Sequence, residues 1–385
     1  MTYLEAGLEV LKLMEMNGYE AYFVGGFVRD FILDYEPNDI DIATNALPEQ
    51  LSNIFEVIKT GIKYNSITIV YEGYHFEATT YRIEGAYIDN RHPIYQIASN
   101  LTDDLKRRDF TINAMAMNKD YLIIDLFDGQ KDIQNKLIKT VYDPHRRFSE
   151  DALRMLRACY FSAKLGFEID KETLNAMRKL GHLVQSLSQD RISWELEKLI
   201  NSKYVNIGIK YLVDTNIAPY LSYFKNGIYI LNSKNKISFS WVEFLAICFY
   251  DNVNNLNEIH LKSVLSNKVK QAIELAKKQP KNAYTNIDLF DYGKEVALIS
   301  NKLNIVFNNS KDNTKNIEKN YDTLAIHTLM ELAIKGQDII DNIKLENNKM
   351  VSVILQDVKE KVLLNKLENN KECILKYIKK HYCLK

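Results

Sequence analysis

The chain changes its hydrophobic pattern once, at Asp143-Pro144, and this change limits the folds open to it. Before that point, short apolar runs alternate with turn residues, which is typical of strands mixed with a few helices. From Ser149 onward, apolar residues recur every three to four positions, which is the period of a helix. We therefore expect an α+β fold, in which a mixed β-sheet with helices is followed by an all-α remainder.

Turn residues and helical periodicity together divide the 385 residues into four expected domains. We predict them at residues 1–143, 144–200, 201–280 and 281–385, and beyond residue 200 the boundaries rest on periodicity alone. Within the last domain, the polar stretch FNNSKDNTKNIEKN at 307–320 predicts a long loop.

Charge is unevenly distributed, although the net charge is zero. Residues 1–100 carry 6 Lys and Arg against 15 Asp and Glu, whereas residues 201–385 carry 27 against 19. The acidic N-terminal region suits cation binding and the basic C-terminal region suits binding of a polyanion, although solvated surface lysines explain part of the same pattern. No apolar stretch is long enough to span a bilayer, so we expect a cytoplasmic protein without membrane contact.

A turn with two glycines, in GGFVRD at residues 25–30, separates a predicted strand from a predicted helix. Because Gly25 and Gly26 have no Cβ, the backbone there can approach an anion at the start of the helix. Arg29 follows one turn later, within reach of the same anion. An ordinary strand-to-helix turn with a surface arginine would have the same sequence, so this motif alone is weak evidence for a phosphate site.

Two aspartates, Asp39 and Asp41, alternate with Ile40 and Ile42 in the run DIDI. Positions two apart in a strand point to one face, so the two carboxylates would lie side by side while the isoleucines pack inward. Like charges this close raise one of the two pKa values. A divalent cation such as Mg²⁺, which binds carboxylates together with substrate phosphates, would relieve the repulsion. The alternative is an exposed edge strand with two acids.

A β-hairpin is predicted for residues 66–81, where two β-rich runs are joined by Glu72-Gly73. This hairpin carries Glu77, for which three roles are open. It could be a third metal ligand, a general base for an attacking hydroxyl, or an ordinary exposed strand residue.

The segment DLKRRDFTINAMAM at 104–117 places charged residues ahead of what we expect to be an apolar helix. Arg108 could bind a triphosphate through two guanidinium nitrogens. Asp109 could cap the helix, and Asn113 could contact a sugar hydroxyl. A basic surface turn is the alternative.

The segment SEDALRMLRACYF at 149–161 predicts a helix start with Ser149 as its cap. Asp151 and Arg154 are three residues apart, and Arg157 lies one turn further along on much the same face. Such an acid–base pair is usually only a surface ion pair. Held in place, however, its carboxylate would accept from an amino group and its guanidinium would donate to a ring nitrogen. Cytosine and adenine fit that pattern, and guanine and uracil do not.

Six motifs in order, GGFVRD, DIDIAT, RRDFTINAMAM, DLFDGQKDI, EDALRMLRA and RISWELEKL, resemble those of the class II tRNA nucleotidyltransferases. This family, part of the polymerase β superfamily, includes the CCA-adding enzymes and the bacterial poly(A) polymerases. The match covers about residues 20 to 200. It implies a nucleotidyltransferase head followed by a helical neck, body and tail. It also implies template-independent, two-metal addition of C, C and A to tRNA, from CTP and ATP, with release of pyrophosphate.

The resemblance also implies roles for the residues singled out above. Asp39 and Asp41 would be the catalytic residues that hold Mg²⁺. Six others would bind the nucleotide: Gly26, Arg29, Arg108, Asp151, Arg154 and Arg157. Of these, Asp151 and Arg154 would select the base. One position departs from the family, which usually has an arginine where Tyr160 stands. A cationic nucleotide contact is therefore absent or supplied elsewhere.

Two other functions stay open at this point. Poly(A) polymerases share the core motifs and would add A tails to RNA, and a non-catalytic RNA-binding relative would be expected to lack the aspartate pair. The segment at 82–104, which in the family is associated with the switch from C to A addition, has its full length. This length argues against an enzyme that adds only C. The implied partners are CTP, ATP and tRNA, bound by its 3′ end and acceptor arm, and the resemblance leaves open whether the chain forms a homodimer.

Overall fold

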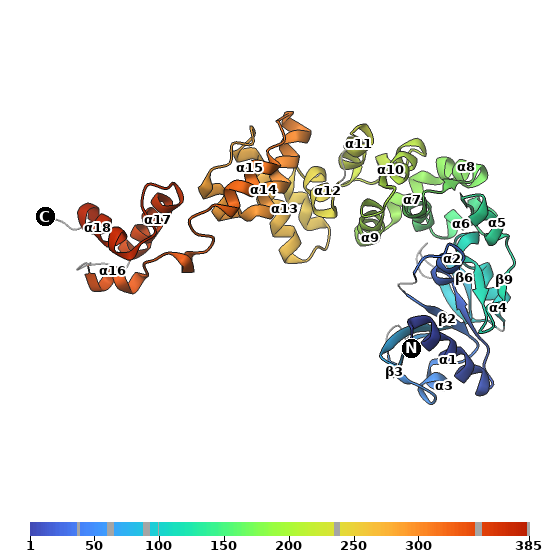
Figure 1. The fold of residues 1–385 in the computed structure, drawn as a ribbon. Helices are drawn as coiled ribbons and strands as arrows, with labels where there is room; N and C mark the ends of the chain where they lie inside the picture. Colours follow the sequence, from blue (N-terminus) through green and yellow to red (C-terminus); the bar gives the residue numbers. More distant parts are fainter. Residues whose placement is uncertain are drawn as a thin grey trace. The chain divides into compact units, whose positions relative to one another are not determined.

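The structure is a computed structural model that describes residues 1–36, 39–59, 65–87, 93–98, 100–234, 239–342 and 349–382. Two compact units make up the chain, Met1–Ser238 and Phe239–Lys385. The first unit contains the sheet and the helices up to α11, and the described elements of the second unit are helices (Figure 1). The expected α+β class with a helical remainder is therefore confirmed, whereas the division into four domains stays a prediction.

A seven-stranded mixed sheet in the order β3-β4-β5-β2-β1-β8-β9 forms the framework of the first unit. Its strands are β1 (Ala21–Val24), β2 (Asp41–Thr44), β3 (Glu56–Ile58), β4 (Ser66–Tyr71), β5 (Tyr74–Thr80), β8 (Met115–Met117) and β9 (Ile123–Asp125). Strands β2 and β5 run parallel, and the other neighbouring pairs run antiparallel. Two smaller sheets pair β6 (Arg82–Tyr87) with β7 (Pro93–Ile97) and β10 (Leu137–Ile138) with β11 (Glu168–Ile169).

Helices lie around this sheet and continue beyond it (Figure 1). Those of the first unit are α1 (Tyr3–Met16), α2 (Gly26–Ile32), α3 (Pro48–Ser52), α4 (Leu101–Lys106), α5 (Gly129–Gln134), α6 (Pro144–Glu150), α7 (Leu153–Leu165), α8 (Lys171–Leu180), α9 (Gln189–Ile200), α10 (Val205–Asp214) and α11 (Lys225–Ser233). Short 3₁₀ helices are η2 (Thr111–Asn113), η3 (Gly181–Ser186) and η4 (Ala218–Tyr220).

The second unit consists of α12 (Trp241–Cys248), α13 (Ser263–Lys278), α14 (Asn286–Asn308), α15 (Thr314–Asp322), α16 (Gly336–Asn342), α17 (Lys349–Leu363) and α18 (Lys371–Tyr382), with 3₁₀ helices η5 (Val253–Glu258) and η6 (Leu329–Glu331). Across the described parts of both units, no helix combines the length and the apolar character that a membrane crossing requires.

The predicted hairpin brings Glu77 next to the aspartates. Glu72 and Gly73 have φ values of 50° and 78°, so both turn residues adopt the left-handed region that a tight two-residue turn requires. The hairpin strands are β4 and β5, as predicted. Parallel pairing of β5 with β2 then sets Glu77 directly opposite Asp41.

The run MAM, which we expected to be helical, is instead the buried strand β8 between β1 and β9. All three of its residues, Met115–Met117, are buried, so it has no polar face that would reveal a strand. A short apolar run of this kind cannot be assigned to helix or strand by periodicity alone.

The helix predicted to start at Ser149 is broken in two. Ser149 and Glu150 end α6, and Asp151 has extended backbone angles (φ −147°, ψ 107°) before α7 begins at Leu153. Ser149 is therefore not a helix cap. Its side chain donates a hydrogen bond back to the His145 carbonyl, 2.8 Å away, as mid-helix serines commonly do.

The loop predicted at 307–320 is also largely wrong, because α14 continues to Asn308 and α15 starts at Thr314. Its polar residues belong to a network of amide hydrogen bonds around the helix ends. Asp312 accepts from the fully buried Asn301 at 2.8 Å, and Asn313 donates to the Asn282 carbonyl at 2.7 Å. Polar composition here reflects hydrogen bonds between helix ends.

Candidate active site

A cleft of about 540 Å³ in the first unit is lined by side chains from the start of α2, the start of β2, the α4–η2 connection, α7 and α9. All eight residues predicted to be catalytic or nucleotide-binding line it: Gly26, Arg29, Asp39, Asp41, Arg108, Asp151, Arg154 and Arg157. Residues as far apart in the chain as Gly26 and Arg157 therefore converge on one site. Their individual roles stay predictions.

The glycine turn allows an arginine to lie close to the backbone. Gly25 has φ 70° and ψ −129°, a conformation that favours glycine. A Cβ atom at Gly25 would lie 2.9 Å from Nη1 of Arg108 and 3.8 Å from Oδ2 of Asp41. The missing side chain thus leaves room for the Arg108 guanidinium beside the acidic residue, and Gly26 starts α2 at the same wall of the cleft.

The two aspartates lie at the N-terminal end of β2. The prediction that one strand carries both aspartates is therefore only partly right, because Asp41 is the first residue of β2 whereas Asp39 precedes the strand and is exposed. Burial of Asp41, with Glu77 opposite it and Asp39 nearby, raises the pKa of the Asp41 carboxyl group to about 6, although Arg108 partly offsets these effects. Negative charge is therefore concentrated here beyond what the protein itself neutralises.

Glu77 does not line the cleft, although its charge acts on Asp41. Within the described residues, no group of three or more His, Cys, Asp or Glu side chains is arranged to hold a metal ion. A cation bound between Asp39 and Asp41 would need its remaining ligands from substrate or water.

The two arginines on the sheet side of the cleft are held by polar partners. Arg29 is almost fully buried, with its Nη2 2.7 Å from Asp30 Oδ1 and its Nη1 donating to Asn113 Oδ1 at 2.7 Å. Arg108 pairs with the buried Asp104, with 3.0 Å between Nη2 and Oδ2. Asn113, predicted to contact a sugar, thus also positions Arg29.

The two arginines of α7 are also paired with acids. Arg154 Nη1 lies 2.9 Å from Glu150 Oε2, and Arg157 Nε donates to Asp109 Oδ2 at 2.7 Å. Burial alone would raise the pKa of Asp109, but Arg157 and neighbouring hydrogen bonds hold it below its ordinary value. Asp109 is therefore not the cap of an apolar helix, as the sequence suggested, but the counter-ion that joins the sheet region to α7.

Asp151 is positioned differently from the predicted helical pair. It lies between α6 and α7, and its Oδ1 accepts a hydrogen bond from the Leu153 amide at 3.0 Å. Its other oxygen, Oδ2, accepts from Arg191 Nη2 on α9 at 2.8 Å. Asp151 and Arg154 both line the cleft, but the break before Leu153 removes them from a common helical face, and each has an ion partner other than the predicted one.

Several cleft residues were not predicted as site residues: Arg107, Tyr160, Phe161, Lys164 and Lys198. Lys164 Nζ lies 3.4 Å from Asp30 Oδ2, and burial together with Arg29 lowers the pKa of Lys164. Lys198 Nζ lies 3.0 Å from Glu195 Oε1 and 5.9 Å from the Tyr160 ring. The helical spacing of Tyr160 and Lys164 after Arg157 could have indicated that they share its face.

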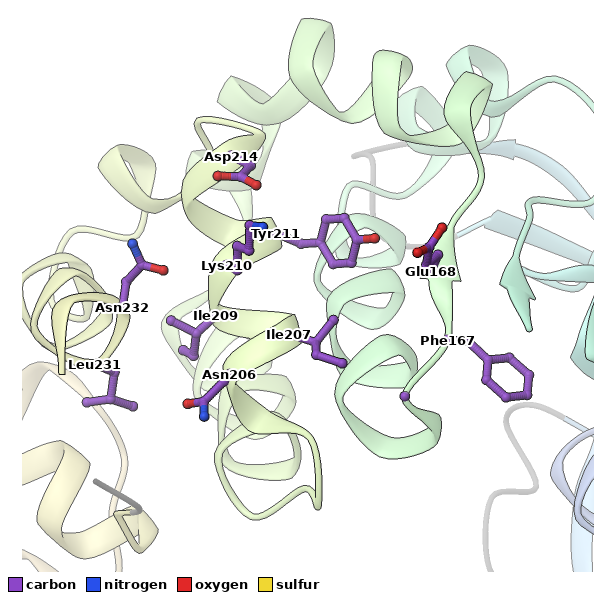
Figure 2. A pocket seen from close by; sticks show the side chains of 11 residues that line it. Phe167, Glu168, Asn206, Ile207, Ile209, Lys210, Tyr211, Asp214, Leu231 and Asn232 are labelled. Carbon is purple, nitrogen blue, oxygen red and sulfur yellow. The ribbon is translucent and has the colours of Figure 1, made fainter. Parts of the chain in front are cut away.

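A second cavity, of about 460 Å³, lies between α10, α11 and the β11 segment (Figure 2). Figure 2 shows Tyr211 on the side of α10 that faces β11, where its hydroxyl accepts a hydrogen bond from the Ile169 amide at 3.2 Å. This cavity contains none of the predicted site residues, and its lining has neither paired aspartates nor an arginine. The chemistry therefore favours the first cleft as the active site.

A mixed sheet with a glycine turn and an aspartate pair, followed by helices that bring arginines to the same cleft, defines a nucleotidyltransferase. Residues 21–139 match the poly A polymerase head domain, and residues 166–224 match the RNA and SrmB-binding site of polymerase A. Residues 236–378 match the tRNA nucleotidyltransferase domain 2.

Whole-chain relatives identify the family. The CCA-adding enzyme of Bacillus cytotoxicus is 35% identical over an alignment of 385 positions, gaps included, which covers 96% of this chain and 96% of that protein. The crystal structure of the Bacillus stearothermophilus CCA-adding enzyme in complex with CTP matches with a TM-score of 0.84 at 29% identity, covering 99% and 98% of the two chains. The Thermotoga maritima CCA-adding enzyme complexed with tRNA shares the fold, with a TM-score of 0.67 at 18% identity over 96% of this chain and 93% of that one. The chain belongs to the family of CCA-adding enzymes, and the predicted family, enzyme class and fold are confirmed.

Proposed function

We propose that this chain adds C, C and A to the 3′ end of tRNA from CTP and ATP in the cleft between β2, α2 and α7, acting in the cytoplasm. The observation that carries the proposal is the convergence of the aspartate pair, the glycine turn and the arginines of two separate regions on one cleft. Full-length similarity to CCA-adding enzymes favours this reaction over poly(A) tailing.

The acidic end of the cleft fits a divalent cation. Asp39 and Asp41 supply carboxylate oxygens, which Mg²⁺ prefers, and the raised pKa of Asp41 indicates negative charge that a cation would offset. We propose that these two residues hold Mg²⁺ together with phosphate oxygens of the substrate. When bound, the ion neutralises charge at the α-phosphate and lowers the pKa of the primer's 3′-hydroxyl group.

The cationic residues near the aspartates would bind the triphosphate. Arg108 lies beside Asp41, and the neighbouring Gly26 amide at the start of α2 can donate to a phosphate oxygen. Asp30 and Asn113 hold the Arg29 guanidinium in place, so Arg29 presents its positive charge at a fixed position. Lys164 adds a second charge close to Arg29 and can supply the cation that Tyr160 does not provide. Held in this way, the nucleotide can be oriented for in-line attack.

The base would be selected by Asp151 and Arg154. Arg191 and the Leu153 amide fix the Asp151 carboxylate, and Glu150 fixes the Arg154 guanidinium, so neither side chain is free to adapt to a different base. The carboxylate then accepts from the amino group of cytosine or adenine, and the guanidinium donates to the adjacent ring nitrogen. Guanine and uracil would leave buried polar groups unpaired.

The tRNA itself would be bound through its backbone, acceptor arm and 3′ end. Residues 201–385 carry 27 Lys and Arg against 19 Asp and Glu, a balance that suits a polyanion. Recognition of this kind depends on shape and charge more than on base sequence.

The test uses a tRNA transcript that lacks CCA, incubated with Mg²⁺ and each nucleoside triphosphate alone and in combination. We expect two C residues with CTP alone and a completed CCA end, followed by a stop, with CTP and ATP. Long A tails would instead indicate a poly(A) polymerase, and no extension would indicate a non-catalytic RNA-binding protein.

A further inference from the structure

An exposed tryptophan, Trp194, stands on α9 at the margin of the cleft. Its side chain is 71% exposed, and it does not itself line the cleft. Lys198, one turn further along α9, has its Nζ 5.5 Å from the Trp194 ring and 5.9 Å from the Tyr160 ring. Because Lys198 and Tyr160 do line the cleft, an aromatic and cationic strip leads from the cleft to the surface.

The contacts of α9 indicate which end of the cleft this strip adjoins. Arg191, three residues before Trp194, pairs with Asp151, and Glu195, the next residue, lies 3.8 Å from Arg157 Nη1. Arg191 and Trp194 are three residues apart and therefore lie on neighbouring parts of one helical face. Trp194 therefore lies on the part of α9 that contacts Asp151, a residue assigned to the base.

We propose that Trp194 and Lys198 form a stacking site for a base at the 3′ end of the RNA primer. The inference rests on the proposed function, and it adds a residue that binds primer instead of nucleoside triphosphate. During CCA addition the last base of the primer changes at each step. A contact through the face of an aromatic ring tolerates such changes, because every base has a π-face, whereas a contact to a base edge would not.

Lys198 strengthens this site in two ways. Its pairing with Glu195, 3.0 Å away, holds the ammonium group between the two rings, and its side chain remains 43% exposed on the solvent side. A cation in this position can contact the phosphate next to a stacked base. Isolated exposed aromatics are common, but this one combines a bound cation with an adjoining active-site cleft.

The test compares Trp194→Ala and Trp194→Phe with the wild type, using tRNA transcripts that end before CCA, after C and after CC. We expect Trp194→Ala to raise the KM for tRNA about tenfold, since stacking contributes roughly 5- to 150-fold per base, with KM for CTP and ATP unchanged. Trp194→Phe should recover most of the loss. Tyr121→Ala, which removes another exposed aromatic outside the cleft, serves as the matched control and should match wild type.

An optical measurement keeps the inference testable without turnover. The chain has 2 tryptophans, and the other, Trp241, is buried in the second unit. In a Trp241→Phe variant, emission therefore reports on Trp194 alone, and tRNA ending in CC should quench it whereas CTP alone should not. Unchanged tRNA KM in Trp194→Ala, or a rise confined to the KM of CTP and ATP, would overturn the inference. Failure of the wild type to extend tRNA would instead overturn the proposed function.

Discussion

Arg157 of α7 and Asp109 of the sheet region form a partly buried ion pair, with 2.7 Å between Nε and Oδ2, although 48 residues separate them in the chain. This pair fixes α7, which carries the residues assigned to nucleotide binding, against the region that carries the aspartates. The alignment of the two regions should therefore depend on it.

Asp109→Asn should destabilise the fold and weaken nucleotide binding together. A hydrogen bond to a charged group contributes about 1.5–3 kcal/mol, so we expect the free energy of unfolding to fall by an amount in this range. The folded pKa of Asp109 is lowered, so its stabilisation is present above the unfolded pKa, roughly 4, and is lost as pH falls through the lower folded pKa. Urea unfolding at several pH values measures the stability and its pH dependence, and the KM for CTP measures nucleotide binding. An equal difference between variant and wild type at pH 3 and pH 7 would argue against the pair.

Asp41→Asn should abolish addition of both C and A, and Asp39→Ala should do the same, because the proposed cation serves every step. The fold should survive, since Asp41 is a repelled acid whose folded pKa of about 6 exceeds its unfolded value. Because the folded pKa of Asp41 is raised, its contribution to the stability of the fold is fully present below the unfolded pKa. This contribution is lost as pH rises through about 6. In EDTA, the variant should therefore gain stability relative to wild type between about pH 4 and pH 6, and the gain should stay constant at higher pH. Mg²⁺ should raise the Tm of wild type but not of the variant, and an identical response in both would contradict the metal assignment.

Shortening the segment at 82–100 should spare C addition and impair A addition, as the family resemblance implies. The described part of this segment contains the antiparallel pair β6 and β7, and residues 88–92 and 99 lie outside the described residues. The rate of C addition to tRNA ending before CCA and the rate of A addition to tRNA ending after CC, measured separately, test this prediction. Parallel loss of both activities would point to a folding defect and against a switching role.

Asp151→Ala should raise the KM for CTP and ATP and allow more UTP and GTP incorporation. The lost carboxylate no longer accepts from the amino group, and it no longer repels the O4 of uracil or O6 of guanine. Arg154→Ala should weaken CTP and ATP use further, because a hydrogen bond from a charged donor contributes about 1.5–3 kcal/mol. If the two residues only form surface ion pairs, worth under about 1 kcal/mol, both variants will keep wild-type discrimination in a four-nucleotide incorporation assay.

Sequence alone predicted the local features that determine this site. The hairpin turn at Glu72-Gly73, the strand before Gly25 and the spacing of Asp39 and Asp41 are set by neighbouring residues, so pattern and backbone preference suffice. The strand β8 was not predicted, because a run of three buried methionine and alanine residues fits the pattern of a helix and that of a strand equally well.

The partners of the charged residues could not be predicted in the same way. Arg191 holds Asp151 across 40 residues, and Asp109 holds Arg157 across 48, so these pairs exist only once the chain is folded. Asparagines such as Asn308 and Asn313 were mistaken for loop residues because composition does not show whether an amide is hydrogen-bonded to a neighbouring helix end. Sequence therefore gave candidates for the site, and the fold showed what holds each one in position.

One cleft should both perform the transfer and choose the base. Sequencing the 3′ ends of tRNA products made with all four nucleoside triphosphates by wild type, Asp41→Ala and Asp151→Ala tests this most directly. We expect CCA ends from wild type, unextended tRNA from Asp41→Ala, and extended ends that contain U or G from Asp151→Ala. Ends other than CCA from wild type, extension by Asp41→Ala, or wild-type fidelity in Asp151→Ala would contradict the account.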